Sequence, residues 1–181
     1  MSDFPELRDH LLAHALRTGD FVLKSGGRSS WFVDAKQSTC RPEGMLLVAE
    51  AVLEVMPADA TAIGGPTMGA DAVAFGVAAV AATRHRLLRS FSVRPEAKDH
   101  GAGGRVAGAL EAGDRVVLTD DAVTRGVSLL DAAEVVRSAG AVPVMVVPVV
   151  DRGTTCAKLA GEAGIAYRAL VTAADLGAPA G

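Results

Sequence analysis

Residues 116 to 128 read Val116-Val117-Leu118-Thr119-Asp120-Asp121-Ala122-Val123-Thr124-Arg125-Gly126-Val127-Ser128, and this segment is the strongest indication of the fold class. An apolar run typical of a buried strand leads straight into two adjacent carboxylates. A short Thr/Gly/Ser segment comes next, followed at once by apolar residues at helical spacing. The stretch therefore predicts a strand over residues 115–119, a loop over 120–128 and a helix over 129–138.

The same order of strands and helices extends in both directions along the chain. We expect helices at 42–56, 71–82 and 156–163, and strands at 62–63, 87–93, 142–150 and 167–171. This alternation predicts an α/β fold, in which a parallel sheet carries helices on both faces. Ligands of such sheets bind beyond the carboxyl ends of the strands. The segments expected at that edge are 64–71, 94–108, 120–128 and 151–155.

A small element precedes this pattern. Helical spacing from Phe4 to Ala15 predicts an amphipathic helix that ends near Gly19. Short strands at 21–23 and 31–33 then suggest a hairpin. Alternation along the second strand places Trp31 and Phe32 on opposite faces, so that one packs in the core and the other is free to stack on a planar base. The alternative is that both aromatic side chains only fill the core.

The acidic segment is suited to binding a sugar phosphate. Backbone N–H groups of the loop and of the following helix can hold a phosphate, and the hydroxyls of Thr124 and Ser128 add donors. Gly126 permits a close approach of the backbone. Asp120 and Asp121 can accept hydrogen bonds from a diol, or hold Mg²⁺ directly or through water. The alternative is that these residues are only helix caps and solvated turn residues. The segment lacks the pattern of a Walker A loop or of a dinucleotide-binding loop.

Residues 94–108 form the second candidate segment. They are polar and rich in glycine, which predicts a long mobile loop. Arg94, Lys98, His100 and Arg105 lie within it. The chain has a formal net charge of -3, so it shows no basic excess that would indicate nucleic-acid binding. A local basic cluster in such a chain suits a pyrophosphate group, although it could also be an ordinary solvated loop.

The composition indicates a globular protein in which half of the residues are hydrophobic. Its 181 residues suit one domain. Cys40 and Cys156 lack metal-ligand spacing, and we expect two reduced thiols. The longest apolar stretch, 72–82, is too short for a membrane span, and the first 21 residues do not resemble a signal peptide. We therefore expect a cytoplasmic protein that does not bind membranes or nucleic acids.

At this point the chain resembles a known family. Residues 118–128 resemble the acidic, phosphate-binding motif of type I phosphoribosyltransferases. The pattern Arg-x-x-x-Lys-x-His-Gly at 94–101 resembles the catalytic loop of the orotate phosphoribosyltransferases within that group. Residues 21–34, 64–71 and the pair Asp151-Arg152 resemble three further segments of these enzymes, in the same order. The chain departs from the family at Pro95, Arg125 and Val127, and residues 64–71 lack the lysine that some members carry there.

The resemblance implies a type I phosphoribosyltransferase fold, with a hood at about residues 1–40 and a core at about 41–181. It implies Mg²⁺-dependent transfer of ribose 5-phosphate from phosphoribosyl pyrophosphate to orotate, with the metal held mainly through the substrate. It also implies a homodimer in which the 94–108 loop reaches the neighbouring active site. The residues implied for catalysis are Lys98, His100, Asp120 and Asp121. Those implied for the sugar donor are Lys24, Arg94, Lys98, His100, Asp120, Asp121, Ala122, Val123, Thr124, Arg125, Gly126, Val127 and Ser128. Those implied for orotate are Phe32, Thr124 and Arg152.

Two alternatives remain open from the sequence. The departures at Pro95, Arg125 and Val127 are compatible with a paralogue that uses another base. A regulatory protein that binds phosphoribosyl pyrophosphate without turnover would retain the same ligand site.

Overall fold

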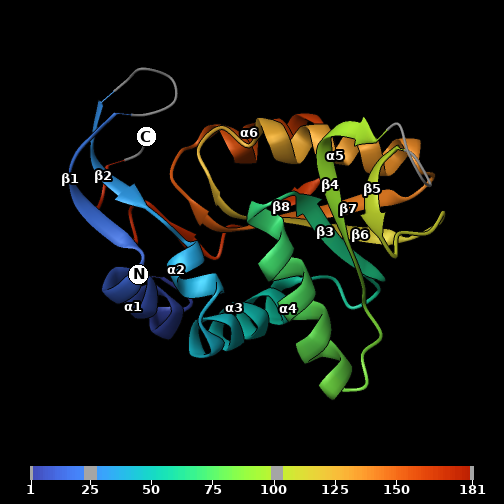
Figure 1. The fold of residues 1–181 in the computed structure, drawn as a ribbon, viewed down its shortest axis with the longest axis horizontal. Coiled ribbons are helices and arrows are strands. Elements are labelled where there is room, and N and C mark those ends of the chain that lie inside the picture. The colour runs from blue at the N-terminus through green and yellow to red at the C-terminus, as the bar shows by residue number, and fades with distance from the viewer. Residues whose placement is uncertain (1, 23–27, 99–103, 180–181) are drawn as a thin grey trace.

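A mostly parallel sheet forms the centre of the molecule, with helices on both faces (Figure 1). The structure is a computed structural model that describes residues 2–22, 28–98 and 104–179. Its helices are α1 (Pro5–His14), α2 (Lys36–Thr39), α3 (Pro42–Val55), α4 (Gly69–Thr83), α5 (Val127–Ser138) and α6 (Thr155–Glu162). Its strands are β1 (Leu16–Val22), β2 (Arg28–Val33), β3 (Ala62–Pro66), β4 (Arg89–Lys98), β5 (Gly104–Gly108), β6 (Arg115–Val123), β7 (Val142–Asp151), β8 (Ala166–Tyr167) and β9 (Val171–Thr172).

The strand order confirms the predicted fold class. The main sheet runs β5-β4-β3-β6-β7-β8, and β9 also pairs with β7. Every pairing is parallel except that between β4 and β5. Because β3, β6 and β7 lie at the centre and run in the same direction, their carboxyl ends meet at one edge of the sheet.

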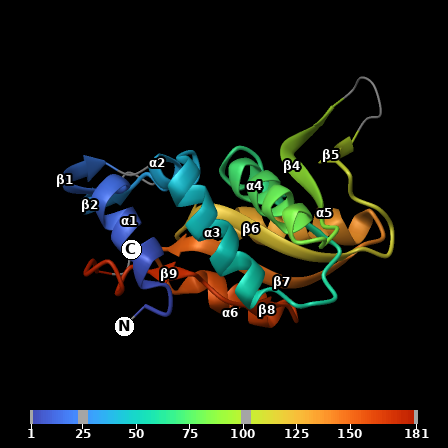
Figure 2. The same cartoon turned by 90° about the horizontal axis from the view of Figure 1, so that it is seen from below.

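The two faces of the sheet bury separate hydrophobic clusters. Helices α3 and α4 cover one face, where Val48 and Val77 are fully buried. Helices α5 and α6 cover the other, where Leu129 and Ala160 are fully buried (Figures 1 and 2). Many of the buried side chains are alanine and valine, which let helices and strands approach closely, so the core beneath the carboxyl edge of the sheet is densely packed.

The hood is a separate antiparallel hairpin, as the sequence predicts. Strands β1 and β2 pair with each other, and β1 begins at Leu16, earlier than expected. Trp31 is buried, whereas Phe32 is 39% exposed, which confirms that the two rings lie on opposite faces. Trp31 belongs to the same hydrophobic cluster as Val150 of β7, so the hood packs onto the core.

Four expectations about secondary structure were wrong. The first helix ends at His14 and not near Gly19, because β1 already begins at Leu16. Residues 94–108 are not one long loop, because β4 continues to Lys98 and pairs with β5 to form a two-stranded ribbon. Residues 120–128 are not all loop either, because β6 continues to Val123, where it still pairs with β7. The single strand expected at 167–171 is two short strands, β8 and β9, which both pair with β7.

In the described part of the chain, none of the helices is both long enough and apolar enough to cross a membrane.

Candidate active site

The acidic pair lies at the carboxyl end of β6 and is held by close contacts. Asp121 is only 6% exposed, and its backbone N–H donates to Oδ1 of Asp120 at 3.0 Å. The Lys36 ammonium, from the start of α2, donates to Oδ2 of Asp121 at 2.5 Å. Both carboxylates also lie against Gly69, where any added Cβ would overlap their oxygens. These contacts therefore fix the positions of the two carboxylates in the native structure.

The electrostatics of the pair are unequal. Burial, followed by the charge of Asp121, raises the pKa of Asp120 well above the ordinary aspartate value. Burial is the largest single effect on Lys36 and lowers its pKa, but the hydrogen bond to Asp121 and the charges of Asp121, Asp120 and Asp34 together outweigh burial and raise the pKa of Lys36. Asp121 thus has a cationic partner and Asp120 readily holds a proton. A ligand that brings hydroxyl donors or positive charge would favour ionisation of Asp120.

An anion-sized hollow follows the pair directly. It has a volume of about 190 Å³ and is lined by Asp120 and residues 122–129. Gly126 adopts a φ of 75°, which favours glycine, and its Cα faces the Cys156 side chain with no room for a Cβ. The backbone of this turn leads into the first turn of α5, whose N–H groups are unpaired within the helix. The loop between β6 and α5, residues 124–126, is shorter than predicted, but its shape suits a phosphate.

Arg152 joins the hood to the same edge of the sheet. Its guanidinium stacks over the Trp31 ring, with Cζ 4.4 Å from the ring centroid, and lies 5.8 Å from the centroid of Phe32. Arg152 is 8% exposed, and its Nε is buried without a hydrogen-bond partner among the described residues. Gly153 packs against the carbonyl of Thr124, which brings the Arg152 turn next to the phosphate-type loop. A buried cation with an unused donor is suited to a planar carboxylate.

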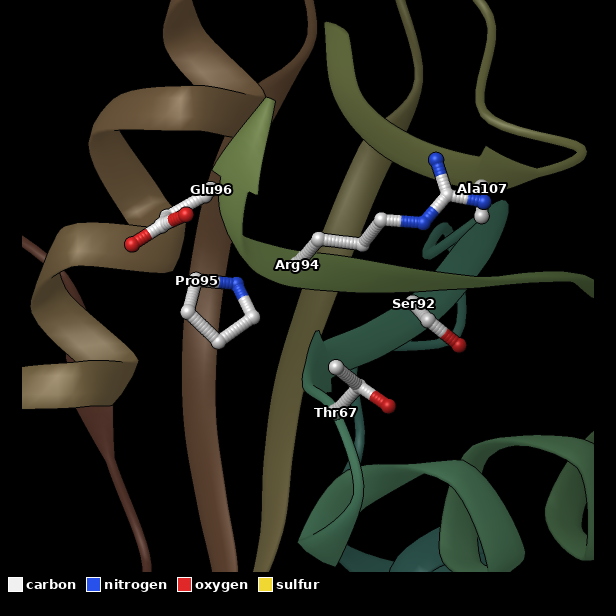
Figure 3. Close-up of a pocket in the computed structure, with 6 residues that line it drawn as sticks. All are labelled: Thr67, Ser92, Arg94, Pro95, Glu96 and Ala107. Atoms are coloured by element: carbon white, nitrogen blue, oxygen red, sulfur yellow. The ribbon is translucent and has the colours of Figure 1, made fainter. Parts of the chain in front are cut away.

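The basic ribbon forms a second hollow, of about 690 Å³ (Figure 3). Arg94 extends toward Ala107, whereas Glu96 points the other way. This hollow shares no lining residue with the one beside Asp120. The ribbon is anchored to α5 because Arg105 binds both the carbonyl of Arg94, at 2.7 Å, and the carboxylate of Asp131.

Three of the predicted cations cannot be placed at the site. Lys24 and His100 lie outside the described residues, and only the backbone of Lys98 is described, as the last residue of β4. Asp120, Asp121, Thr124, Phe32 and Arg152 come together around the ends of β6 and β7, as expected. Arg125 and Val127 are exposed, and both line the hollow beside Asp120.

Comparison with known proteins identifies the family. Curated orotate phosphoribosyltransferases from a Nostoc species and from Streptomyces avermitilis are 37% and 39% identical to the chain, covering 94% and 95% of it and 84% and 93% of their own lengths. The chain belongs to the orotate phosphoribosyltransferase family.

Solved structures of related enzymes have the same fold as this chain. One of them is the orotate phosphoribosyltransferase of Mycobacterium tuberculosis in complex with phosphoribosyl pyrophosphate. It is 29% identical to this chain and superposes with a TM-score of 0.81, and the match covers 97% of this chain and 99% of the M. tuberculosis chain. Leishmania donovani adenine phosphoribosyltransferase, at 18% identity and a TM-score of 0.66, shares the fold. No family model matches the chain. The fold class and the transferase class expected from the sequence are thereby confirmed.

Sequence reasoning missed two features of this family member's site. Lys36 contacts Asp121 across 85 positions of sequence, and no local pattern marks it. The Asp151 carboxylate accepts hydrogen bonds from the Tyr167 hydroxyl and from the Gly153 N–H, and so fixes the turn around Arg152. The position of Asp151 at the end of a strand that is expected to be buried could have indicated this role, because buried carboxylates need hydrogen-bond partners.

The two cysteines should differ sharply in reactivity. Cys40 is exposed, whereas Cys156 is fully buried beneath Gly126. Burial, with smaller contributions from the charges of Asp151 and Asp120, raises the pKa of Cys156 to about 12. Since thiolates are the reactive form, we expect a thiol reagent to label Cys40 alone in the native protein and both cysteines after unfolding. Mass spectrometry of labelled peptides checks this, and rapid native labelling of Cys156 would contradict it.

Proposed function

We propose that this chain transfers ribose 5-phosphate from phosphoribosyl pyrophosphate to N1 of orotate, giving orotidine 5-monophosphate and pyrophosphate in pyrimidine biosynthesis. The observation that carries the proposal is the shared hollow, in which Asp120 and the turn before α5 lie side by side. One ligand can therefore present a sugar hydroxyl to the Asp120 carboxylate and a phosphate to backbone N–H groups at the same time. Family membership supports the same reaction.

The sugar half of the donor suits the end of β6. The 5-phosphate would bind the 124–128 segment through its backbone and through the hydroxyls of Thr124 and Ser128. Asp120 and Asp121 would accept hydrogen bonds from the ribose hydroxyls. As the bond to pyrophosphate breaks, positive charge develops on the ribose ring, and nearby carboxylates stabilise it more strongly than they stabilise the ground state.

Orotate suits the edge of the sheet where Arg152 meets the hood. The guanidinium can bind the orotate carboxylate through two parallel hydrogen bonds, while Trp31 holds its plane in place. The exposed ring of Phe32 is available to stack on the base, and Thr124 offers a hydroxyl next to the sugar site. These contacts would orient N1 toward the anomeric carbon, which is the main requirement of a reaction without a covalent enzyme intermediate.

We assign the pyrophosphate to the basic residues Lys24, Arg94, Lys98 and His100, which would offset its growing negative charge. The ribbon that carries Arg94 and Lys98 projects past the edge of the sheet and away from the hood (Figures 1 and 2). We therefore propose a homodimer in which the ribbon of one subunit completes the site of its partner. We further propose a cytoplasmic enzyme whose hood (about 1–40) and core (about 41–181) form one domain, supported by their shared hydrophobic cluster.

The acidic pair fits a Mg²⁺ ion that is held mainly by the donor. In the described ranges, no group of three His, Cys, Asp or Glu side chains gathers that could hold a metal. Asp120 and Asp121 are oxygen ligands of the kind that Mg²⁺ prefers, but Lys36 already occupies one oxygen of Asp121. The remaining ligands would be donor oxygens and water. When bound, Mg²⁺ would help to neutralise the pyrophosphate group.

An assay of orotate consumption tests the proposal. Purified protein with orotate, phosphoribosyl pyrophosphate and Mg²⁺ should lower the ultraviolet absorbance of orotate. No loss at high enzyme concentration would refute the proposed activity. Turnover with a different base would indicate a paralogue, and tight donor binding without any product would indicate a regulatory protein.

Replacing Arg152 with lysine should weaken orotate binding selectively. Lysine keeps the charge but cannot form two parallel hydrogen bonds or stack on Trp31 in the same way. We expect the KM for orotate to rise roughly tenfold or more, as for a lost charged hydrogen bond, with little change in the KM for the donor. Arg168→Lys, at an exposed arginine paired with Asp3, is the matched control. An unchanged KM for orotate would contradict the assignment.

A further inference from the structure

A lysine of the hood reaches the acidic pair of the core. Lys36 is the first residue of α2, and its ammonium donates to Oδ2 of Asp121 at 2.5 Å. Within the described ranges, it is the cation that pairs with this carboxylate. We propose that Lys36 is a positioning residue for sugar binding, which holds the Asp121 carboxylate in the orientation that accepts the ribose diol. This inference rests on the proposed function.

The need for such a residue follows from burial and charge. The Asp121 side chain is 9% exposed and lies beside a second carboxylate, Asp120. A buried carboxylate without a cation would turn toward water. That movement would separate Oδ1 of Asp121 from Oδ1 of Asp120, which lies beside it against Gly69. Lys36 prevents this movement before the donor arrives, so the site is already arranged when the sugar binds.

The position of Lys36 is itself fixed by packing. Its helix, α2, is short, but Ala35 before it and Ser38 and Thr39 within it are buried. The Ser38 hydroxyl lies 3.0 Å from Nδ1 of His10, which braces α2 against α1. The lysine stem therefore starts from a rigid base, although 42% of its side chain remains exposed. This chain of contacts links the hood to the sugar-binding edge of the sheet.

The inferred role predicts a separation between binding and chemistry. In this scheme Lys36 acts through Asp121, which binds the donor, and Lys36 itself does not contact the reacting bond. We expect Lys36→Met to raise the dissociation constant for phosphoribosyl pyrophosphate with Mg²⁺ about tenfold, by calorimetry. The kcat with saturating donor should fall less than about threefold. Lys36→Arg, which retains a cationic donor, should restore most of the affinity.

A double-mutant cycle tests whether Lys36 acts through Asp121. If it does, adding Lys36→Met to Asp121→Asn should weaken donor binding little beyond Asp121→Asn alone. Lys158→Met, at an exposed lysine of α6, is the matched control and should bind like the wild type. Thermal unfolding of each variant checks that it is folded. If Lys36→Met does not fold, Lys36→Arg takes its place in the cycle.

The outcomes separate this inference from the proposed function. Additive effects in the cycle would overturn the role of Lys36 but not the proposed function. The same holds if Lys36→Met binds the donor as tightly as the wild type does. Loss of kcat without loss of affinity would also overturn it. Failure of the wild type to bind phosphoribosyl pyrophosphate would overturn both the inference and the proposed function.

Discussion

Replacing Gly69 with alanine should reduce kcat/KM for the donor by about 100-fold or more while leaving the protein folded. An alanine Cβ at this position would overlap Oδ1 of both Asp120 and Asp121. The ends of two flexible side chains can move aside at small cost in stability, but they would then leave the positions that bind the ribose. Displacement of binding groups by about 1 Å is enough to cost roughly 100-fold in rate.

The backbone at Gly69 gives no reason to expect misfolding. It is the first residue of α4 and is not among the glycines with positive φ, so alanine is compatible with its conformation. Gly161→Ala in α6 is the matched control, because a Cβ there meets nothing within 4 Å. Steady-state kinetics and thermal unfolding of both variants check the prediction. Equal kcat/KM for Gly69→Ala and the wild type would show that the acidic pair does not bind the donor as we propose.

Gly69 and Lys36 also show where sequence reasoning stops. The strand that ends in Asp120 and Asp121 is visible in the sequence, because an apolar run followed by carboxylates is a local pattern. The contacts that hold the carboxylates come from α4 and α2, which are far away in the chain. A glycine at the start of a helix and a lysine after a strand are common, and only the packing of the hood and α4 against β6 gives them a role.

The extent of β6 and of the ribbon could not be predicted for a related reason. Strand patterns are recognised from the burial of alternate side chains. Residues 94–97 are mostly exposed, and the regular pairing with the edge strand β5 is interrupted between Val93 and Lys98, so no apolar face marks them. Pro95 further reduced the strand signal, although proline is tolerated near a sheet edge. Similarly, β6 continues past its carboxylates because the long β7 supplies backbone partners as far as Asp151.

Replacing Lys98 with alanine should reduce kcat by about 100- to 1000-fold, the usual cost of removing one group that stabilises developing charge. The variant should stay folded, because Lys98 is the last residue of β4 and pairs there with Gly104, the first residue of β5. Lys158→Ala on α6 is the control for loss of an exposed lysine. Steady-state kinetics with both substrates, with circular dichroism of each variant, measures the effect. Unchanged turnover by Lys98→Ala would remove the ribbon from the proposed mechanism.

The same variant decides which subunit Lys98 serves. If the ribbon crosses to its partner, a heterodimer of one Lys98→Ala subunit and one Gly69→Ala subunit contains one intact site, because the Lys98→Ala subunit keeps its acidic pair and receives Lys98 from its partner. Its other site carries both defects. Heterodimers isolated through two different affinity tags should therefore regain about half of the wild-type activity, as two-fold symmetry requires. If Lys98 serves its own subunit, each site carries one defect and the heterodimer stays as inactive as its parents. Recovery of activity thus requires both the dimer and the crossing ribbon.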